Sequence, residues 1–285
     1  MQIDRVDLYK YFGKERKGNQ QGYLNVYIAE EPCTFDGKDR ERPAMLVIAG
    51  GGYQGVSKRE KEPVALEYLR KGFNAFTLEY SIDADCVYPT ALLEGCMAMC
   101  YIRENAEKLF VKKDKIACIG FSAGGHLTAM IHCLYNEQVV KDYLGERAKL
   151  TRPDAVILSY AVITSGKSSH AGSIKTISGG NEEIAKFLSM EKRVHKKVCP
   201  AFIWTTFGDG AVPMENSLLY AMAMRKKKVP FELMVFEKGQ HGLSVASEIT
   251  AHSKVAVVDR VSMWVDLSIG WLRERGFMMN CVNGE

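Results

Sequence analysis

The chain of 285 residues contains no apolar run near the roughly 20 residues that a membrane-spanning helix requires. Its first segment, MQIDRVDLYKYFGKERKG, alternates charged and isolated apolar residues, which is not the pattern of a secretory signal. The net charge of +4 is small, and the lysine run Lys226–Lys228 suits a solvated helix end. We therefore expect no membrane partner and no nucleic-acid partner.

None of the eight cysteines forms a C-x-x-C pair, and the sequence contains no N-x-Ser/Thr sequon. Several cysteines lie in apolar segments, where a free thiol behaves as a small hydrophobic group. Cys96 and Cys100 would share one helix face, but no histidine or carboxylate stands at a spacing that would complete a metal site. These features predict reduced cysteines, a cytoplasmic protein and no metal site.

Short apolar runs alternate with longer amphipathic segments, a pattern typical of βαβ units around a mostly parallel sheet. The strands that this pattern predicts are 23–29, 44–49, 73–79, 115–119, 155–160, 201–206 and 231–236. The predicted helices are 63–71, 89–109, 123–135, 184–188, 214–227 and 253–275, and residues 4–8 with 22–29 predict an antiparallel edge. No repeat or long linker interrupts the chain, so residues 1–285 are predicted to form one domain.

One segment departs from the general composition, the polar stretch SGKSSHAGSIKTISGG at residues 165–180. It follows the predicted strand 155–160, so we expect a loop inserted over the carboxyl edge of the sheet. Such a loop is either a plain surface excursion or one wall of a ligand site, and its position favours the wall.

The strongest chemical motif is G-x-S-x-G at residues 120–124, within KIACIGFSAGGH. A short apolar strand precedes it and a helical pattern follows, as in a nucleophile elbow, where flanking glycines leave room for a serine on a strained turn. The alternative is a glycine-rich helix start with a capping serine. The context favours Ser122 as a nucleophile, with its hydroxyl at a helix N-terminus.

A serine nucleophile needs a base, and the base needs an acid that orients it. Asp209 follows the predicted strand 201–206 in a glycine-flanked turn, which makes it a better candidate than Glu215 or Glu237. His241 lies between two glycines after the last predicted strand and is the predicted base, with His170 in the polar stretch as its only rival. The order serine, acid, histidine is that of the α/β-hydrolase fold.

The stretch MLVIAGGGYQG allows two interpretations, because Gly50, Gly52 and Gly55 fit the G-x-G-x-x-G spacing of a dinucleotide-binding turn. Glu79, at the end of the following strand, would then bind the ribose. However, the next predicted helix begins near Pro63, beyond the charged stretch SKREKE, so no helix N-terminus would face a pyrophosphate. The alternative is favoured: an oxyanion hole formed by the N–H groups of Gly51, Gly52 and Ala123.

Together, the segments AGGGYQGVSKREKEPVA, IGFSAGGH, DGAVPMENSLLYAMAM and GQHG resemble small bacterial α/β-hydrolases of the acetylxylan-esterase-like or carbohydrate-esterase-like family, over nearly the whole chain. The resemblance implies a mostly parallel sheet of about eight strands flanked by helices, without a large cap domain. It also implies hydrolysis of short acyl esters, usually acetyl groups on sugars, through an acyl-serine and without a cofactor. Ser122, Asp209 and His241 match the family's triad positions.

The expected partner is a small ester, with an acetylated sugar or xylo-oligosaccharide as the favoured class. Tyr53 and His170 are candidate substrate contacts, as is Tyr80, although each can equally be a packing or loop residue. Aromatic residues near the C-terminus would permit a homodimer. A ligand-binding protein without turnover, a peptidase and a lipase of the same fold are the alternative functions.

Overall fold

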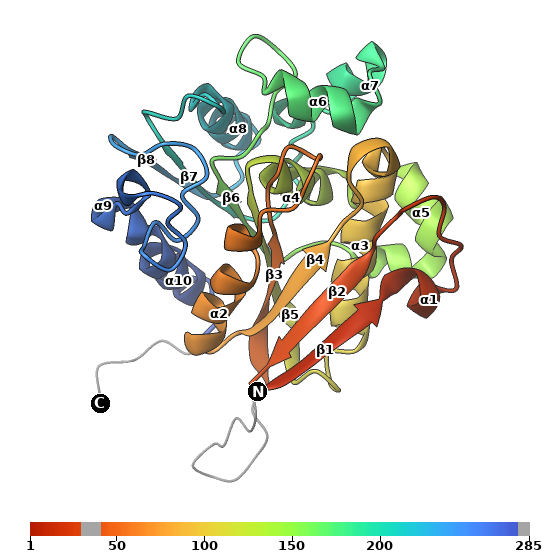
Figure 1. Ribbon diagram of the computed structural model, residues 1–285. Helices are drawn as coiled ribbons and strands as arrows, with labels where there is room; N and C mark the ends of the chain where they lie inside the picture. Colours follow the sequence, from red (N-terminus) through yellow and green to blue (C-terminus); the bar gives the residue numbers. More distant parts are fainter. Residues whose placement is uncertain (30–40, 279–285) are drawn as a thin grey trace, which may run out of the picture.

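A single sheet of eight strands runs through the computed structural model, which describes residues 1–29 and 41–278 (Figure 1). The strand order within the described residues is β1-β2-β4-β3-β5-β6-β7-β8. Strands β3 to β8 are parallel, whereas β1 and β2 form an antiparallel edge next to β4. The strands are β1 Gln2–Asp7, β2 Tyr23–Ile28, β3 Arg42–Ile48, β4 Asn74–Glu79, β5 Val111–Phe121, β6 Ala155–Ser159, β7 Ala201–Thr206 and β8 Phe231–Phe236.

Helices cover both faces of this sheet (Figure 1). The α-helices of the described residues are α1 Leu8–Phe12, α2 Glu62–Arg70, α3 Thr90–Glu104, α4 Ser122–Leu134, α5 Gln138–Leu144, α6 Ala171–Ser178, α7 Glu182–Phe187, α8 Glu215–Lys226, α9 Asp259–Ser262 and α10 Trp264–Glu274. The 3-10 helices are η1 Lys58–Glu60, η2 Asp83–Cys86, η3 Gly145–Leu150, η4 Met190–Lys192 and η5 Lys254–Ala256. None of these described helices is long and apolar enough to cross a bilayer.

The sheet separates two apolar cores, because neighbouring side chains of a strand point to opposite faces. In β3, Leu46 joins the core beneath α1, α3, α4, α5 and α8, whereas its neighbour Val47 joins the core beneath α2, α9 and α10. Strands that are buried on both faces read as continuous apolar runs, which is how β3 and β5 stand out in the sequence. The mostly parallel α/β architecture that the sequence predicted is confirmed.

The predicted strands and the antiparallel edge are all present, whereas the helices differ more. The predicted helix 253–275 is divided into η5, α9 and α10, and the short helices α1, α5 and α6 were not predicted. The prediction of a loop throughout 165–180 was wrong, because α6 forms within it. The side chain of His170 accepts a hydrogen bond from the N–H of Ser173 and caps this helix, and Ile174 and Ile177 anchor it by burial.

The cysteines predicted to be reduced are free and buried at the six described positions, while Cys33 and Cys281 lie outside the described residues. Burial raises the pKa of the Cys118 thiol to about 12, so this side chain stays neutral and packs as a hydrophobic group. The described ranges contain no group of three or more His, Cys, Asp or Glu side chains that could hold a metal ion.

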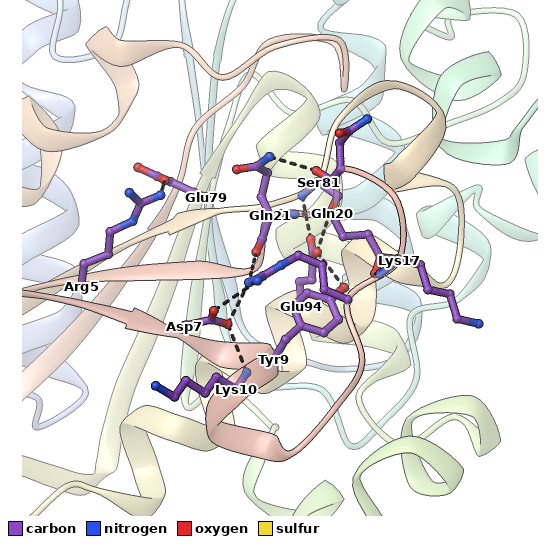
Figure 2. A network of polar contacts seen from close by, with 12 residues as sticks. Arg5, Asp7, Tyr9, Lys10, Lys17, Gln20, Gln21, Glu79, Ser81 and Glu94 are labelled. Carbon is purple, nitrogen blue, oxygen red and sulfur yellow. Dashed lines mark hydrogen bonds and ion pairs between the residues drawn. The ribbon is translucent and has the colours of Figure 1, made fainter.

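A polar network ties the N-terminal segment to the edge of the sheet, with Glu94 of α3 at its centre (Figure 2). The carboxylate of Glu94 accepts hydrogen bonds from the Tyr9 hydroxyl at 3.0 Å and from the N–H of Ser81 at 2.7 Å. The Ser81 hydroxyl also donates to Glu94 and accepts from the N–H of Gln21 at 2.9 Å. Burial raises the pKa of Glu94 from an ordinary 4.5 to about 7, despite these hydrogen bonds.

This raised pKa predicts a pH-dependent stability. The folded protein holds the Glu94 proton more tightly than the unfolded chain does, so this contribution is complete below pH 4.5 and is lost as pH rises through about 7. As pH rises over that range, the free energy of unfolding of the wild type should therefore fall relative to that of Glu94→Gln, by at most about 3 kcal/mol. Thermal unfolding followed by circular dichroism across the range measures the difference.

Glu107→Gln, an exposed position just beyond the end of α3, is the matched control and should keep the pH profile of the wild type. Parallel stability curves for the wild type and Glu94→Gln would contradict the raised pKa.

Candidate active site

Ser122 lies at a sharp turn between β5 and the first residue of α4. Its φ angle of 51° is left-handed, a conformation that costs an L-residue with a side chain about 1–2 kcal/mol. The neighbouring chain approaches so closely that a Cβ at Gly120 would collide with the carbonyl of Gly124, and one at Gly124 would collide with that of Ala49. The flanking glycines of the motif are therefore required by the space around the turn.

Ser122, His241 and Asp209 form one hydrogen-bonded chain. The Oγ of Ser122 lies 2.8 Å from Nε2 of His241, and Nδ1 of His241 lies 2.7 Å from Oδ2 of Asp209. The three residues come from different places in the sequence: the start of α4, the turn after β7 and the segment after β8. The parallel strands bring them together at the carboxyl edge of the sheet.

Asp209 is held firmly in this arrangement. Its Oδ1 accepts hydrogen bonds from the N–H groups of Ala211 at 2.9 Å and Val212 at 2.8 Å, which leaves Oδ2 for the imidazole. The carboxyl side chain is almost fully buried, whereas that of His241 remains 23% exposed. With Nδ1–H donated to Asp209, Nε2 of His241 is free to accept the proton of the Ser122 hydroxyl.

The glycine loop after β3 turns its backbone toward Ser122. Gly51 and Gly52 have φ angles of 132° and 68°, in the region that favours glycine. A Cβ on Gly50 would lie 2.9 Å from the Cβ of Ser122, so the loop and the serine are in close contact. Within residues 1–29 and 41–278, the N–H groups of Gly51, Gly52 and Ala123 donate no hydrogen bond.

Tyr53 and Tyr80 have no exposed surface. The Tyr53 hydroxyl lies 2.9 Å from Nδ1 of His126, and the Tyr80 hydroxyl donates to the carbonyl of Ala49 at 2.8 Å. The two rings also contact each other, with 5.9 Å between their centroids. Because the Tyr53 side chain has no exposed surface, Tyr53 is not among the proposed substrate contacts.

His170 lies near this centre, at the start of α6. Burial is the main cause that lowers its pKa below the ordinary value, and the charge of His241 lowers it further, against the opposing effect of Asp209. Nδ1 of His170 accepts from the N–H of Ser173 at 3.2 Å, which leaves the neutral ring with its proton on Nε2. A Cβ added to Gly52 would lie 3.8 Å from the Ser173 hydroxyl, so the first turn of α6 faces the glycine loop.

A groove of about 600 Å³ runs beside the glycine loop, between η2 and α6. In Figure 1, α6 and α7 lie beyond the carboxyl ends of the parallel strands, the edge of the sheet at which β5 leads into Ser122. Its lining combines four polar side chains with small and apolar residues: Gln54, Asp83, Ala84, Val87, Gly172, Lys175, Thr176, Gly179 and Gly180. The sequence did not point to Asp83 or Lys175, because no periodic signal links η2 to α6.

Two buried side chains that the sequence also missed contact the loops of the site. Glu60 accepts a hydrogen bond from the N–H of Gly50, and the ring of Tyr160 packs edge-on against the imidazole of His241. In the sequence, Glu60 belongs to the charged stretch SKREKE, which looks like an exposed surface segment.

Comparison with known proteins is consistent with this geometry. Residues 34–224 match the family model described as BD-FAE. The chain is 32% identical to the acetyl ester-xyloside bifunctional hydrolase from Caldicellulosiruptor lactoaceticus, with a TM-score of 0.77 over 90% of this chain and 89% of that one. It superposes on the carboxylesterase Cest-2923 from Lactobacillus plantarum WCFS1 with a TM-score of 0.85 at 26% identity, over 98% and 100% of the two chains.

Two longer relatives match part of their length. Endo-1,4-beta-xylanase B from Butyrivibrio fibrisolvens is 42% identical over 216 residues, which are 74% of this chain and 34% of that protein. The acetylxylan esterase from Xylanibacter ruminicola is 25% identical over 221 residues, which are 74% of this chain and 43% of that protein. The chain thus spans less than half the length of these two relatives. Family match, fold and structural neighbours agree, and the chain belongs to the BD-FAE family of α/β-hydrolases.

Proposed function

We propose that the chain is a serine esterase that hydrolyses short acyl esters, acetyl esters in particular. The observation that carries the proposal is the hydrogen-bonded chain from Asp209 through His241 to Ser122, whose serine stands on a left-handed turn at a helix start. A nucleophile, a base and an orienting acid at these distances are the groups that acyl transfer through an enzyme-bound ester requires.

In the first step, Nε2 of His241 takes the Ser122 proton as Oγ attacks the ester carbonyl. Asp209 holds the imidazole tautomer and stabilises the imidazolium that forms. The tetrahedral intermediate then collapses, the C–O bond to the alcohol breaks, and His241 returns its proton to the departing alkoxide. Water repeats the sequence on the acyl-serine, releases the carboxylic acid and regenerates Ser122.

The negative charge of the tetrahedral intermediate needs fixed hydrogen-bond donors. The N–H groups of Gly51, Gly52 and Ala123, which donate no hydrogen bond within the described part of the chain, are the proposed oxyanion hole. One such donor is worth roughly 10²–10³-fold in turnover in known serine hydrolases. The absence of side chains at both glycines keeps the carbonyl oxygen of the substrate within reach of the backbone.

An acetylated sugar or xylo-oligosaccharide is the proposed substrate class. The groove beside the glycine loop offers a carboxylate, an ammonium, an amide and a hydroxyl, which suit an alcohol that carries several hydroxyl groups. His170 is the proposed contact nearest the scissile bond, with its Nε2–H free to donate. Relatives described as an acetyl ester-xyloside hydrolase and an acetylxylan esterase support this choice.

The primary test is hydrolysis of p-nitrophenyl acetate, butyrate and octanoate by the wild type and by Ser122→Ala. We expect activity to fall with acyl-chain length, and kcat to fall by at least about 10⁴-fold in the variant because no nucleophile remains. Ser253→Ala, at an exposed serine before η5, is the control and should match the wild type. A wild type that hydrolyses none of the esters would contradict the proposal and favour a ligand-binding role.

The sugar groove makes a separate prediction. Lys175→Ala and Asp83→Ala each remove a polar group from opposite walls, so KM for an acetylated xylo-oligosaccharide should rise by roughly 2–10-fold for each lost hydrogen bond. The KM for p-nitrophenyl acetate should change much less, because its alcohol presents no sugar hydroxyls to the groove. Steady-state kinetics on both substrates measure the contrast, with Lys186→Ala on α7 as the control. Equal changes for the two substrates would contradict the assignment of the groove.

A further inference from the structure

Two loops of the proposed active site are joined by a short segment that contacts both. The glycine loop carries the proposed oxyanion donors, and the segment Gly242–Ser244 directly follows His241. The 3-10 helix η1 lies between them, with Arg59 and Glu60 directed toward the two loops. Among the described residues, neither side chain is hydrogen-bonded to Ser122, and neither has a role in the proposed acyl transfer.

Glu60 is buried, with 3% of its surface exposed, and both oxygens of its carboxylate are engaged. Oε2 accepts from the N–H of Gly50 at 2.9 Å, and Oε1 accepts from the hydroxyl of Tyr160 at 2.7 Å. No Lys, Arg or His side chain of the described residues lies within ion-pair distance of Glu60. A carboxylate buried in this way is costly unless its hydrogen bonds are made, and here both partners are donors.

Tyr160 continues the connection to the base. Its hydroxyl oxygen accepts from the N–H of Ser244 at 2.9 Å, and its ring lies edge-on to the His241 imidazole with 5.0 Å between ring centroids. The Ser244 hydroxyl in turn donates to the carbonyl of Arg59 at 2.6 Å, and the Arg59 guanidinium donates to the carbonyl of Gly242 at 2.8 Å. The segment after His241 is therefore held against η1 at several points.

The direction of these hydrogen bonds is fixed by chemistry. Two of the donors are backbone N–H groups, which cannot accept, so the Tyr160 hydroxyl must accept from Ser244 and donate to Glu60. Glu60 must then accept from both Tyr160 and Gly50, which an ionised carboxylate can do. A glutamine has one acceptor oxygen, and its –NH₂ would face either the Gly50 N–H or the Tyr160 hydroxyl.

We propose that Glu60 is a positioning residue that couples the oxyanion loop to the loop of the base through Tyr160. The inference rests on the esterase function proposed above. Because Glu60 takes the N–H of Gly50, that group is withdrawn from the site, and the donors left to the oxyanion are those of Gly51, Gly52 and Ala123. The same carboxylate fixes Tyr160, whose ring limits the position of His241.

The test is Glu60→Gln, which keeps size and shape but places one donor against another. We expect kcat for p-nitrophenyl acetate to fall by roughly 10–100-fold with KM changed less than about threefold, because the transition state depends on the donors more than substrate binding does. The affinity for phenylboronic acid, which forms a tetrahedral adduct with a reactive serine, should fall in parallel with kcat/KM. Glu62→Gln, exposed at the first residue of α2, is the matched control.

Tyr160→Phe separates coupling from a purely structural role. It keeps the ring against His241 but removes the hydroxyl, and it should reproduce the kcat loss of Glu60→Gln. In the double variant, the glutamine amide no longer meets a hydroxyl donor, so the two losses should not multiply. Losses that multiply, or a rise in KM alone, would overturn the coupling.

Amide hydrogen exchange provides a readout that does not depend on turnover. In Glu60→Gln, exchange should accelerate at Gly50 and also at Ser244, whose N–H donates to the Tyr160 hydroxyl and not to Glu60. Unchanged exchange at Ser244 would overturn the inference even if the wild type hydrolyses no ester. An active wild type with unaltered kcat in both variants would overturn it while leaving the esterase proposal intact.

Discussion

The left-handed backbone of Ser122 is the constraint on which the rest of the site depends. The chain passes from β5 directly into α4 at this residue, so the serine hydroxyl stands clear of the sheet at a helix start. Such a conformation persists only where the surroundings determine it fully. They do so here, because α4 is buried along its whole length and glycines at 50, 120 and 124 allow backbone to approach from three sides.

From that point, the parallel sheet explains why residues far apart in sequence meet. Each loop that contributes to the site follows the carboxyl end of a strand: the glycine loop follows β3, the Asp209 turn follows β7 and the His241 segment follows β8. The sheet brings these loops to one edge, but it does not by itself fix the positions of their side chains as closely as hydrogen bonds require. Buried polar contacts supply the remaining accuracy, through the two N–H groups that hold Asp209 and the carboxylate of Glu60 that holds Gly50.

The strands and the principal motifs could be read from the sequence because each has a local cause. Runs such as 44–49 are apolar since both faces of the sheet are covered, and the glycines around Ser122 are required by short contacts along the chain. Helix α6 was missed because its serines and glycines resemble a loop, and it forms through a histidine cap and two buried isoleucines. Glu60 was missed because a buried carboxylate and an exposed one look the same in a charged stretch.

The sequence by itself determined the α/β architecture, the turn that presents Ser122 and the order in which Asp209 and His241 follow it. Periodicity, glycine spacing and the order of residues along the chain can be read without knowledge of tertiary contacts. Only the tertiary structure decided that Tyr53 is fully buried, that a groove lies between α6 and η2, and that Glu60 joins two loops through Tyr160. These features depend on burial and on hydrogen bonds between residues up to 100 positions apart, which no local pattern encodes.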